Sequence, residues 1–403
     1  MIIKLQFLKS LFFISIIFLS FNCSEEKLNN DSLNNDSLNN DWDKLDLKGE
    51  VKSFRQIHFE AKESFGEVVK KNNYPISNKP NRKKIFNENG KIIEVIYYKK
   101  YNNDIDSKIV YEYDNKGNML EITYYNSDNE VKSKRANEYD KKGNKIKFIR
   151  YDADDKIKFE RNYEYDEKGN EIKREDYNSD SKLEETYIHK YDKNSNEIES
   201  IEYNSDGRLK EKNIYEYDKN SNKIESTEYD SDGMISDKTI YKYDKNGNRD
   251  FIIYYGSDGQ VSTKVESRYD NNNNEMMRVI YNSRGEIKYK FQYEYDENDN
   301  KTDEEYIEHF DDGSKSRKTY KYDGSGNEIE VKIFDDVSHS IFEYKYDKYG
   351  NMTYMHFVSR SGDFESLDEH IYEYDKVGNW TKKIHYSNNK ARSIAQREFE
   401  YFD

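Results

Sequence analysis

Aspartate and asparagine side chains alternate with other residues in short runs, a spacing that could bind calcium. An Asp-x-Asn-x-Asn run occupies residues 192–196 and 244–248. An EF-hand calcium loop that begins in this way needs Gly at its sixth position and a bidentate Glu at its twelfth. After Asp244 those positions hold Arg249 and Tyr255. Asp and Asn also stabilise tight turns by bonding to nearby backbone groups, and we interpret the runs as turns.

The histidines show no spacing that metal-dependent catalysis requires. None forms a His-Glu-x-x-His pair, and the chain has no Gly-x-Ser-x-Gly elbow, phosphate loop or dinucleotide fingerprint. The sequence therefore predicts no catalytic residue, no metal site and no cofactor, and we expect a non-enzymatic protein. A hydrolase subunit stays open as an alternative, although it would require a site that the sequence does not show. The seven histidines are His58, His189, His309, His339, His356, His370 and His385.

Aromatic residues are the remaining candidates for ligand binding. The chain has 39 Tyr, and most of them recur at a fixed spacing. This regularity favours a structural role in the packing of a thin sheet, with sugar stacking as the alternative. Phe334, Trp380 and Tyr386 stand in the less regular C-terminal part, and they are the candidate ligand-binding aromatics.

The tyrosines belong to a repeat that runs along most of the chain. Each unit contains a Tyr-Asp pair; the first seven steps between pairs are 26 residues, and the last three are 27, 24 and 28. Self-similarity at such a period indicates a repeat architecture. The pairs begin at Tyr113, Tyr139, Tyr165, Tyr191, Tyr217, Tyr243, Tyr269, Tyr295, Tyr322, Tyr346 and Tyr374.

Each unit predicts two β-strands. A second turn signal follows the repeat Asp by twelve residues, as at residues 204–207, so two turns divide the unit into strands of about eight residues. A type I turn followed by a left-handed residue would join the strands as hairpins with a bulge. About twelve such units, starting at Asn87, predict an all-β fold: an elongated antiparallel meander or solenoid, twisted or curled.

Side-chain alternation predicts where the tyrosines point. Counted from the repeat Asp, Tyr or an aliphatic residue recurs at the odd offsets +11, +17, +23 and +25. After Asp192 these are Tyr203, Leu209, Tyr215 and Tyr217. Because successive side chains of a strand alternate between faces, we expect these columns to share one face of the sheet.

The N-terminal residues predict export and a tether. Residues 1–22 have two lysines and an apolar run, as in a secretory signal peptide. Cys23, the only cysteine, follows directly. It resembles the lipidation site of a bacterial lipoprotein, although Ser20 and Asn22 depart from the usual box; a buried or free thiol is the alternative. Residues 23–41 repeat the pentad Leu-Asn-Asn-Asp-Ser and predict a flexible tether.

Charge and composition limit the kinds of partner that we expect and indicate how the chain is divided into domains. The formal net charge is −15, and the chain lacks the concentrated basic surface that nucleic acid requires, so we expect no nucleic-acid partner. Hydrophobic residues are 34%, which is low for a large globular protein. Residues 42–86 predict an N-terminal segment whose strand caps the open edge of the first repeat. The repeat array follows over residues 87–403.

The Tyr-x-Tyr-Asp-x-x-Gly-Asn phrase resembles the RHS/YD repeat over roughly residues 86–403. The resemblance implies β-strand repeats of a large secreted or cell-surface protein. Some members of that family form hollow shells around a toxin, others act in adhesion, and carbohydrate binding is attributed to them. Toxin shells end in a Pro-rich self-cleaving segment, but no proline follows Pro80 here, so we expect no toxin cargo. The full phrase stands at residues 111–118, 163–170, 241–248, 344–351 and 372–379.

The function expected from the sequence is that of a non-enzymatic cell-envelope lipoprotein whose β-repeats mediate binding, adhesion or scaffolding. A carbohydrate-binding module that recognises envelope or host glycans is the alternative. The expected partners are the membrane, through a lipid on Cys23, and envelope or host proteins or glycans. The expected location is the bacterial envelope after export across the inner membrane, at the outer membrane or the cell surface.

Overall fold

The structure is a computed structural model, and it describes residues 40–76, 81–100, 103–308, 313–335, 339–359 and 364–403. Residues 41–403 form one compact unit, in which the short helix α2 (Asp41–Lys44) precedes 27 strands. The predicted signal peptide, Cys23 and residues 23–39 of the predicted tether lie outside the described residues. In the described part, no helix has the length and apolar character needed to cross a membrane.

The strands follow one another at nearly regular intervals. The first nine are β1 (Val51–Ser64), β2 (Glu67–Pro75), β3 (Arg82–Phe86), β4 (Ile92–Tyr98), β5 (Ile105–Tyr113), β6 (Met119–Tyr125), β7 (Val131–Tyr139), β8 (Lys145–Tyr151) and β9 (Ile157–Tyr165). The next nine are β10 (Glu171–Asn178), β11 (Leu183–Tyr191), β12 (Glu197–Asn204), β13 (Leu209–Tyr217), β14 (Lys223–Tyr229), β15 (Ile235–Tyr243), β16 (Arg249–Gly256), β17 (Val261–Tyr269) and β18 (Glu275–Tyr281). The last nine are β19 (Ile287–Tyr295), β20 (Lys301–Glu308), β21 (Lys315–Tyr322), β22 (Glu328–Asp335), β23 (His339–Tyr346), β24 (Met352–Ser359), β25 (Glu365–Tyr374), β26 (Trp380–Ser387) and β27 (Lys390–Tyr401).

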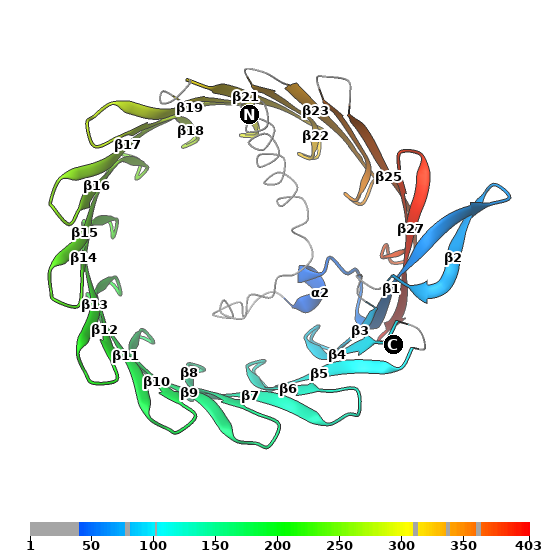
Figure 1. The fold of residues 1–403 in the computed structure, drawn as a ribbon, viewed down its shortest axis with the longest axis horizontal. Coiled ribbons are helices and arrows are strands. Elements are labelled where there is room, and N and C mark those ends of the chain that lie inside the picture. Colours follow the sequence, from blue (N-terminus) through cyan, green and yellow to red (C-terminus); the bar gives the residue numbers. More distant parts are fainter. Residues whose placement is uncertain (1–39, 77–80, 101–102, 309–312, 336–338, 360–363) are drawn as a thin grey trace, which may run out of the picture. The chain divides into compact units, whose positions relative to one another are not determined.

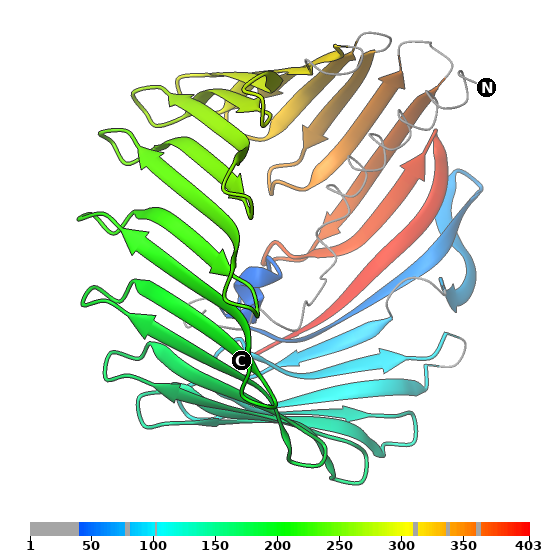
Figure 2. The ribbon, with the colours of Figure 1, turned by 60° about the vertical axis from the view of Figure 1, so that its left-hand side comes forward.

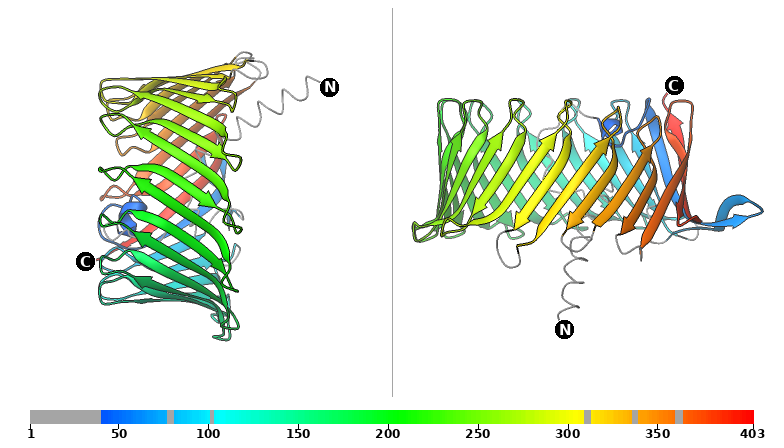
Figure 3. Two further views of the ribbon diagram at one scale, coloured as in Figure 1. Left: turned by 90° about the vertical axis from the view of Figure 1, so that its left-hand side faces the viewer. Right: turned by 90° about the horizontal axis from the view of Figure 1, so that it is seen from above.

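These strands form one antiparallel sheet that closes into a barrel (Figures 1 and 2). From β3 to β27 each strand pairs with its neighbours in sequence, and β1 joins the ends by pairing with both β3 and β27. Among the described strands, β2 pairs with β1 alone, so 26 strands make up the ring. The β1–β2 hairpin projects beyond it (Figure 3). At about 4.8 Å per strand and a tilt of about 40°, such a barrel is about 50 Å across.

The predicted open, elongated solenoid is therefore wrong. The strand expected at the edge of the first repeat does pair there, with β3, but its other edge pairs with β27 from Val51 opposite Tyr401 to Glu60 opposite Ser393. Twist and strand tilt curl a long sheet, and closure pairs the two edges that an open array would expose. The repeat spacing is local information, whereas this pairing joins the two ends of the chain.

The turn chemistry follows the prediction. In the turn after Tyr191, the Asp192 N–H donates to the Asn196 carbonyl at 2.9 Å, and the Ser195 N–H donates to the Asp192 carbonyl at 3.1 Å. Ser195 has a φ of 65°, in the left-handed region. The strand register shifts between Lys190 and Tyr191, which is the bulge. The expected type I turn with a left-handed residue and a bulge is confirmed.

The prediction that all the Tyr columns share one face is wrong, and the bulges explain why. Beside the turn at residues 126–130, Tyr124 lies opposite Ser133 but Tyr125 lies opposite Val131. Lys132 is therefore an extra residue, which reverses the alternation between the two strands. As a result, the Tyr at offset +11 lies on one face of the sheet and the Tyr residues at +23 and +25 lie on the other.

Helix α2 identifies the inner face, because it lies inside the ring (Figures 1 and 2). Its Trp42 packs in a buried cluster with Leu47, Val51, Phe54 and Phe86. Phe54 lies opposite Phe399 and Lys84, and following opposite residues from strand to strand around the ring assigns each side chain to a face. The +23 and +25 tyrosines lie on this inner face and the +11 tyrosines on the outer face. The cluster is the main buried core, and it sits where the ring closes.

The outer face carries cross-strand ion pairs in the middle of the strands. Lys212 Nζ lies 2.8 Å from Glu199, and Lys238 Nζ lies 2.6 Å from Glu225. Lys147 similarly lies 3.0 Å from a carboxylate on β9. A lipid-facing barrel presents an apolar band, and a Lys near the bilayer midplane costs about 2–4 kcal/mol. The mid-strand charges therefore give this face the character of a water-exposed surface.

Candidate binding surface inside the barrel

A ladder of tyrosine hydroxyls holds one rim of the barrel. Nine of the eleven tyrosines of the Tyr-Asp pairs each end a strand and donate a hydrogen bond to the carbonyl of a residue that begins the preceding strand, at 2.7–3.0 Å. These bonds close the open ends of successive hairpins. The nine donors are Tyr113, Tyr139, Tyr165, Tyr191, Tyr217, Tyr243, Tyr269, Tyr295 and Tyr322.

The turns of this rim are stabilised internally and joined to one another. Asp192 accepts from the backbone N–H groups of Asn194 and Asn196, and from the Asn196 side chain at 2.9 Å. Donation from the Asn196 side chain and backbone lowers the pKa of Asp192. The same Asn196 amide donates to Ser221 Oγ in the next turn at 3.0 Å. The repeated Asp, Asn and Tyr residues thus build a uniform frame.

A second set of positions occupies the middle of the strands on the inner face and differs from repeat to repeat. We name it the inner row: the residues at offsets +21 and +10 of successive repeats, which lie directly opposite each other. Continued through the less regular strands, the inner row pairs Ile109–Tyr124, Arg135–Arg150, Arg161–Asp176, Tyr187–Glu202, Asn213–Glu228, Thr239–Tyr254, Val265–Ile280, Phe291–Tyr306, Lys318–Ile333, Phe342–Phe357, His370–His385, Arg397–Gln56 and Arg82–Tyr97.

One sector of the inner row is basic. It runs from β27 through β1 and β3 to β9 and includes the Arg135–Arg150 pair. The Arg135 guanidinium lies 5.4 Å from the ring centre of Tyr124, and that of Arg150 lies 5.1 Å from the ring centre of Phe159. At one end of the sector, burial lowers the pKa of the Arg397 guanidinium to about 10, and the charge of Arg82 adds to this shift.

The adjoining sector is acidic. Carboxylates lie directly opposite each other on the inner face in three successive hairpins, beginning with Asp176 opposite Glu185. This sector meets the basic one at Arg161, whose guanidinium donates to both oxygens of Asp176 at 2.6 and 2.7 Å. The other two opposed pairs are Glu202–Glu211 and Glu228–Asp237.

A third sector, from β16 to β24, is apolar and aromatic apart from Lys318 of β21. The rings of Phe342 and Phe357 lie 4.7 Å apart, and those of Phe291 and Tyr306 lie 5.2 Å apart. Phe364, which is 60% exposed, continues this sector at 5.8 Å from Phe357. These rings form part of a single sheet layer rather than a core between two layers, so much of their surface faces the barrel interior.

A histidine pair separates the aromatic and basic sectors. The rings of His370 and His385 lie 5.0 Å apart, and His385 Nε2 lies 3.2 Å from an Asp368 carboxylate oxygen. Burial, with the nearby charges of Lys383 and His385, lowers the pKa of His370 to about 4, so this ring is neutral near pH 7. Among the described residues, no group of three or more His, Cys, Asp or Glu is placed to hold a metal ion.

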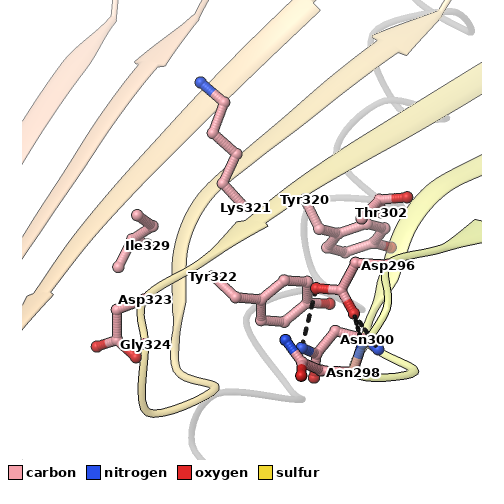
Figure 4. A pocket seen from close by; sticks show the side chains of 10 residues that line it. All are labelled: Asp296, Asn298, Asn300, Thr302, Tyr320, Lys321, Tyr322, Asp323, Gly324 and Ile329. Carbon is pink, nitrogen blue, oxygen red and sulfur yellow. Dashed lines mark hydrogen bonds between the residues drawn. The ribbon is translucent and has the colours of Figure 1, made fainter.

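Two hollows of about 440 and 450 Å³ lie at equivalent places in different repeats. The first is lined by Asp296, Asn300, Tyr320 and Tyr322 among others, and Figure 4 shows the Asp296 carboxylate bonded to its own turn. The second is lined by the corresponding residues around Tyr163. Because the repeat itself produces these hollows, neither distinguishes a catalytic site.

The three aromatic residues singled out from the sequence do not form one site. Trp380 lies against inner-face residues: the guanidinium of Arg397 is 3.7 Å from its ring centre, and its edge meets the ring of Tyr372. Tyr386, opposite Glu369, and Phe334, opposite Arg317, are on the outer face.

The inner row is not found by a search for residues that recur, because its residues differ from repeat to repeat. The informative signal was the reverse: offsets +10 and +21 change from Arg to Glu to Phe while the Tyr-Asp phrase around them stays the same. That contrast is visible in the sequence once the units are aligned. The pairing of the two offsets across a strand boundary is visible only in the structure.

Comparisons with known proteins identify no family for this chain. No family model and no curated protein match it. The crystal structure of TcdB2-TccC3-Cdc42 is similar over 80% of this chain and 24% of that chain, at 12% identity and a TM-score of 0.29. The Photorhabdus luminescens Tc holotoxin pore is similar over 76% and 22%, at 11% identity and 0.28. A porin-like protein from Bacteroides uniformis is similar over 88% and 98%, at 8% identity and 0.23. The chain spans about a quarter of the length of the first two.

Proposed function

We propose that this chain is a non-enzymatic cell-envelope protein that binds or scaffolds a partner on the inner surface of its barrel, as a relative of the YD-repeat proteins. Export and lipidation at Cys23 are part of the proposal. A lipid at that position would hold the barrel at a membrane surface, and the mid-strand ion pairs of the outer face, such as Lys212–Glu199, suit a barrel that stands in water beside the membrane.

The observation that carries the proposal is the contrast between the uniform frame and the inner row. Residues that only maintain the barrel can be the same in every repeat, as the Tyr ladder and the Asp-Asn turns are. The inner row instead places basic, acidic and aromatic groups in separate sectors. A surface divided in this way can recognise one orientation of a ligand, because each sector attracts a different part of it.

The chemistry of the inner row suits binding better than catalysis. Its acidic and basic groups are spread along the wall, and the two hollows repeat with the sheet. Catalysis needs a nucleophile or base brought within hydrogen-bonding reach of a partner group at one place. An extended ligand, by contrast, could contact several strands of a barrel about 50 Å across.

The experiment that tests this function compares neighbouring residues that point to opposite faces. Tyr254 is on the inner face and Tyr255, the next residue of β16, is on the outer face. We expect the full-length protein to bind at least one ligand from a panel of glycans and purified envelope proteins. Tyr254→Ala should weaken that binding and Tyr255→Ala should leave it unchanged. Equal losses of binding in both substituted proteins, or a loss in Tyr255→Ala alone, would contradict binding on the inner face.

The anchor has a separate test. When the chain is expressed with its own N-terminus in a bacterium, we expect it in the membrane fraction, whereas Cys23→Ser should move it to the soluble fraction. An unchanged distribution would argue against lipidation and leave binding by the barrel unaffected.

A further inference from the structure

The basic sector contains an arginine pair whose charge is not neutralised by an acidic partner among the residues that the structure describes. Arg135 and Arg150 lie directly opposite each other on β7 and β8. Like charges in this position destabilise a sheet. In the described strands from β3 to β9, the inner face carries no Asp or Glu. The aromatic rings of Tyr124 and Phe159 are the neighbours over which the two guanidiniums lie.

The next inner-row pair shows what a structural solution looks like at the same position. There the partner of Arg161 is Asp176, which is 5% exposed and accepts two hydrogen bonds from the guanidinium. An acidic residue at position 135 or 150 would give the same neutral pair. The chain keeps two cations instead, with guanidinium N–H groups that can donate to a carboxylate in bidentate geometry.

The surroundings of the pair point to a ligand that carries apolar as well as acidic groups. Ile109 and Phe148, both half-buried, lie on the inner face around it. Each guanidinium also lies over a ring, at Tyr124 and at Phe159, so these rings have less free face for stacking against a sugar or a base. Aliphatic side chains instead suit the apolar side chains of a peptide.

The acidic sector restricts the ligand further. Three pairs of opposed carboxylates follow the basic sector directly along the wall, from Asp176–Glu185 to Glu228–Asp237. A polymer with a charge on every unit, such as single-stranded nucleic acid, would meet repulsion as it crossed from one sector to the next. A peptide can confine its carboxylates to the part that contacts Arg135 and Arg150.

We propose that the inner face around Arg135 and Arg150 binds an extended acidic segment of a partner protein, with carboxylates on the two guanidiniums and apolar side chains on the neighbouring aliphatic and aromatic residues. This inference rests on the proposed binding function and specifies its ligand. The segment would lie across the strands of the wall. The backbone groups of these strands are already paired within the sheet, so side chains rather than strand addition supply the contacts.

The test uses the full-length protein and a fluorescent peptide of Glu-Glu-Leu-Leu repeats, which places Glu and Leu on both sides of an extended chain. We expect saturable binding that weakens with added salt. The doubly substituted Arg135→Gln/Arg150→Gln protein should bind about tenfold more weakly or worse, because two charge-assisted hydrogen-bonding groups are lost. The same substitutions relieve like-charge repulsion, so the melting temperature should be unchanged or higher.

Three controls separate this proposal from its alternatives. Arg208→Gln/Arg268→Gln removes the same charge from a turn and from the outer face of β17, and it should leave peptide affinity unchanged. A Gln-Gln-Leu-Leu peptide should bind poorly. Polygalacturonate and single-stranded DNA should bind more weakly than the acidic peptide.

The outcomes distinguish this inference from the proposed function. Equal losses of peptide affinity in the two doubly substituted proteins would overturn the proposal of an acidic peptide ligand. Tighter binding of polygalacturonate or DNA than of the peptide at Arg135 and Arg150 would overturn it as well. Failure of the acidic peptide, together with a ligand whose binding Tyr254→Ala weakens, would overturn this inference and leave binding inside the barrel standing. If no ligand bound in a way that depended on Arg135, Arg150 or Tyr254, the result would count against both this inference and the proposed binding function.

Discussion

The tyrosine of a Tyr-Asp pair can combine two physical roles in one side chain. Where another tyrosine stands two residues earlier, the two rings can stack, as those of Tyr163 and Tyr165 do at 6.4 Å. Its hydroxyl reaches a main-chain carbonyl of the neighbouring strand, as in the 2.9 Å bond from Tyr191 to Glu171. A Tyr can supply apolar contact area at one end and a hydrogen bond at the other, which suits a single sheet layer without a deep core.

Removal of one ladder hydroxyl tests how much that bond contributes. Tyr191→Phe keeps the ring and leaves the Glu171 carbonyl without its side-chain donor, so we expect the free energy of unfolding to fall by about 1 kcal/mol. Urea unfolding followed by circular dichroism measures the change. Tyr203→Phe, at offset +11 on the outer face, is the control and should change stability by less than about 0.5 kcal/mol. Equal losses for the two would show that the ladder bond has no special role.

At the scale of single elements, each turn that follows a Tyr-Asp pair contains one left-handed residue. Gly326 has a φ of 83° in the turn that follows β21. A Cβ added there would meet nothing within 4 Å, and the same is true of Gly324 in the same turn, whose φ is not in the left-handed region. The two glycines therefore separate backbone strain from steric crowding.

Alanine substitution at the two glycines should have opposite effects. Gly326→Ala forces an L-residue into the left-handed region, which costs about 1–2 kcal/mol. Gly324→Ala meets no such strain and reduces the freedom of the unfolded chain, so it should be neutral or stabilise by up to about 1 kcal/mol. Thermal unfolding of the two variants beside the unsubstituted protein makes the comparison. A loss at Gly324 as large as that at Gly326 would refute the backbone explanation.

The elements were predictable from the sequence to the extent that their signals are local. The turn phrase at residues 192–196 determines its own hydrogen bonds, so its conformation followed from residue types. The face of the sheet to which each side chain points could not be predicted in this way. Bulge residues such as Lys132 reverse the alternation from one strand to the next, so the faces can be assigned only when the bulges are known. The inner row and the sector around Arg135 and Arg150 depend on that parity, which is why the candidate surface was missed.

At the scale of the whole molecule, closure converts a repeat array into a continuous ring. Strand β1 does not contain the Tyr-Asp phrase, yet it pairs with both β27 and β3 and so closes the ring. Around it, Asn379 exchanges two hydrogen bonds with the backbone of Lys48, at 2.8 and 2.7 Å. No comparable sequence signal marks the pairing of β1 with β27. Local sequence patterns therefore could not distinguish an open array from a closed barrel.

Because stabilising contacts are distributed around this ring, tyrosine ionisation should affect the whole molecule at alkaline pH. Burial raises the pKa of several inner-face tyrosines to about 12, among them Tyr139, Tyr191, Tyr293 and Tyr372, against about 10 in an unfolded chain. Between these values the folded state holds more protons than the unfolded state, so stability falls as pH rises. It is unaffected by these groups below pH about 9, where both states are protonated.

We therefore expect the melting temperature to decrease steadily above pH about 10 and the barrel to unfold cooperatively as the pH approaches about 12. Tyrosinate absorbance and circular dichroism, recorded together, measure ionisation and unfolding on one sample. Lys212, whose pKa is raised by Glu199, acts in the same direction, so repetition in high salt, which screens such exposed pairs, isolates the tyrosine contribution. Gradual ionisation centred near pH about 10 with an unchanged circular dichroism spectrum would show that the tyrosine ladder does not hold the ring together.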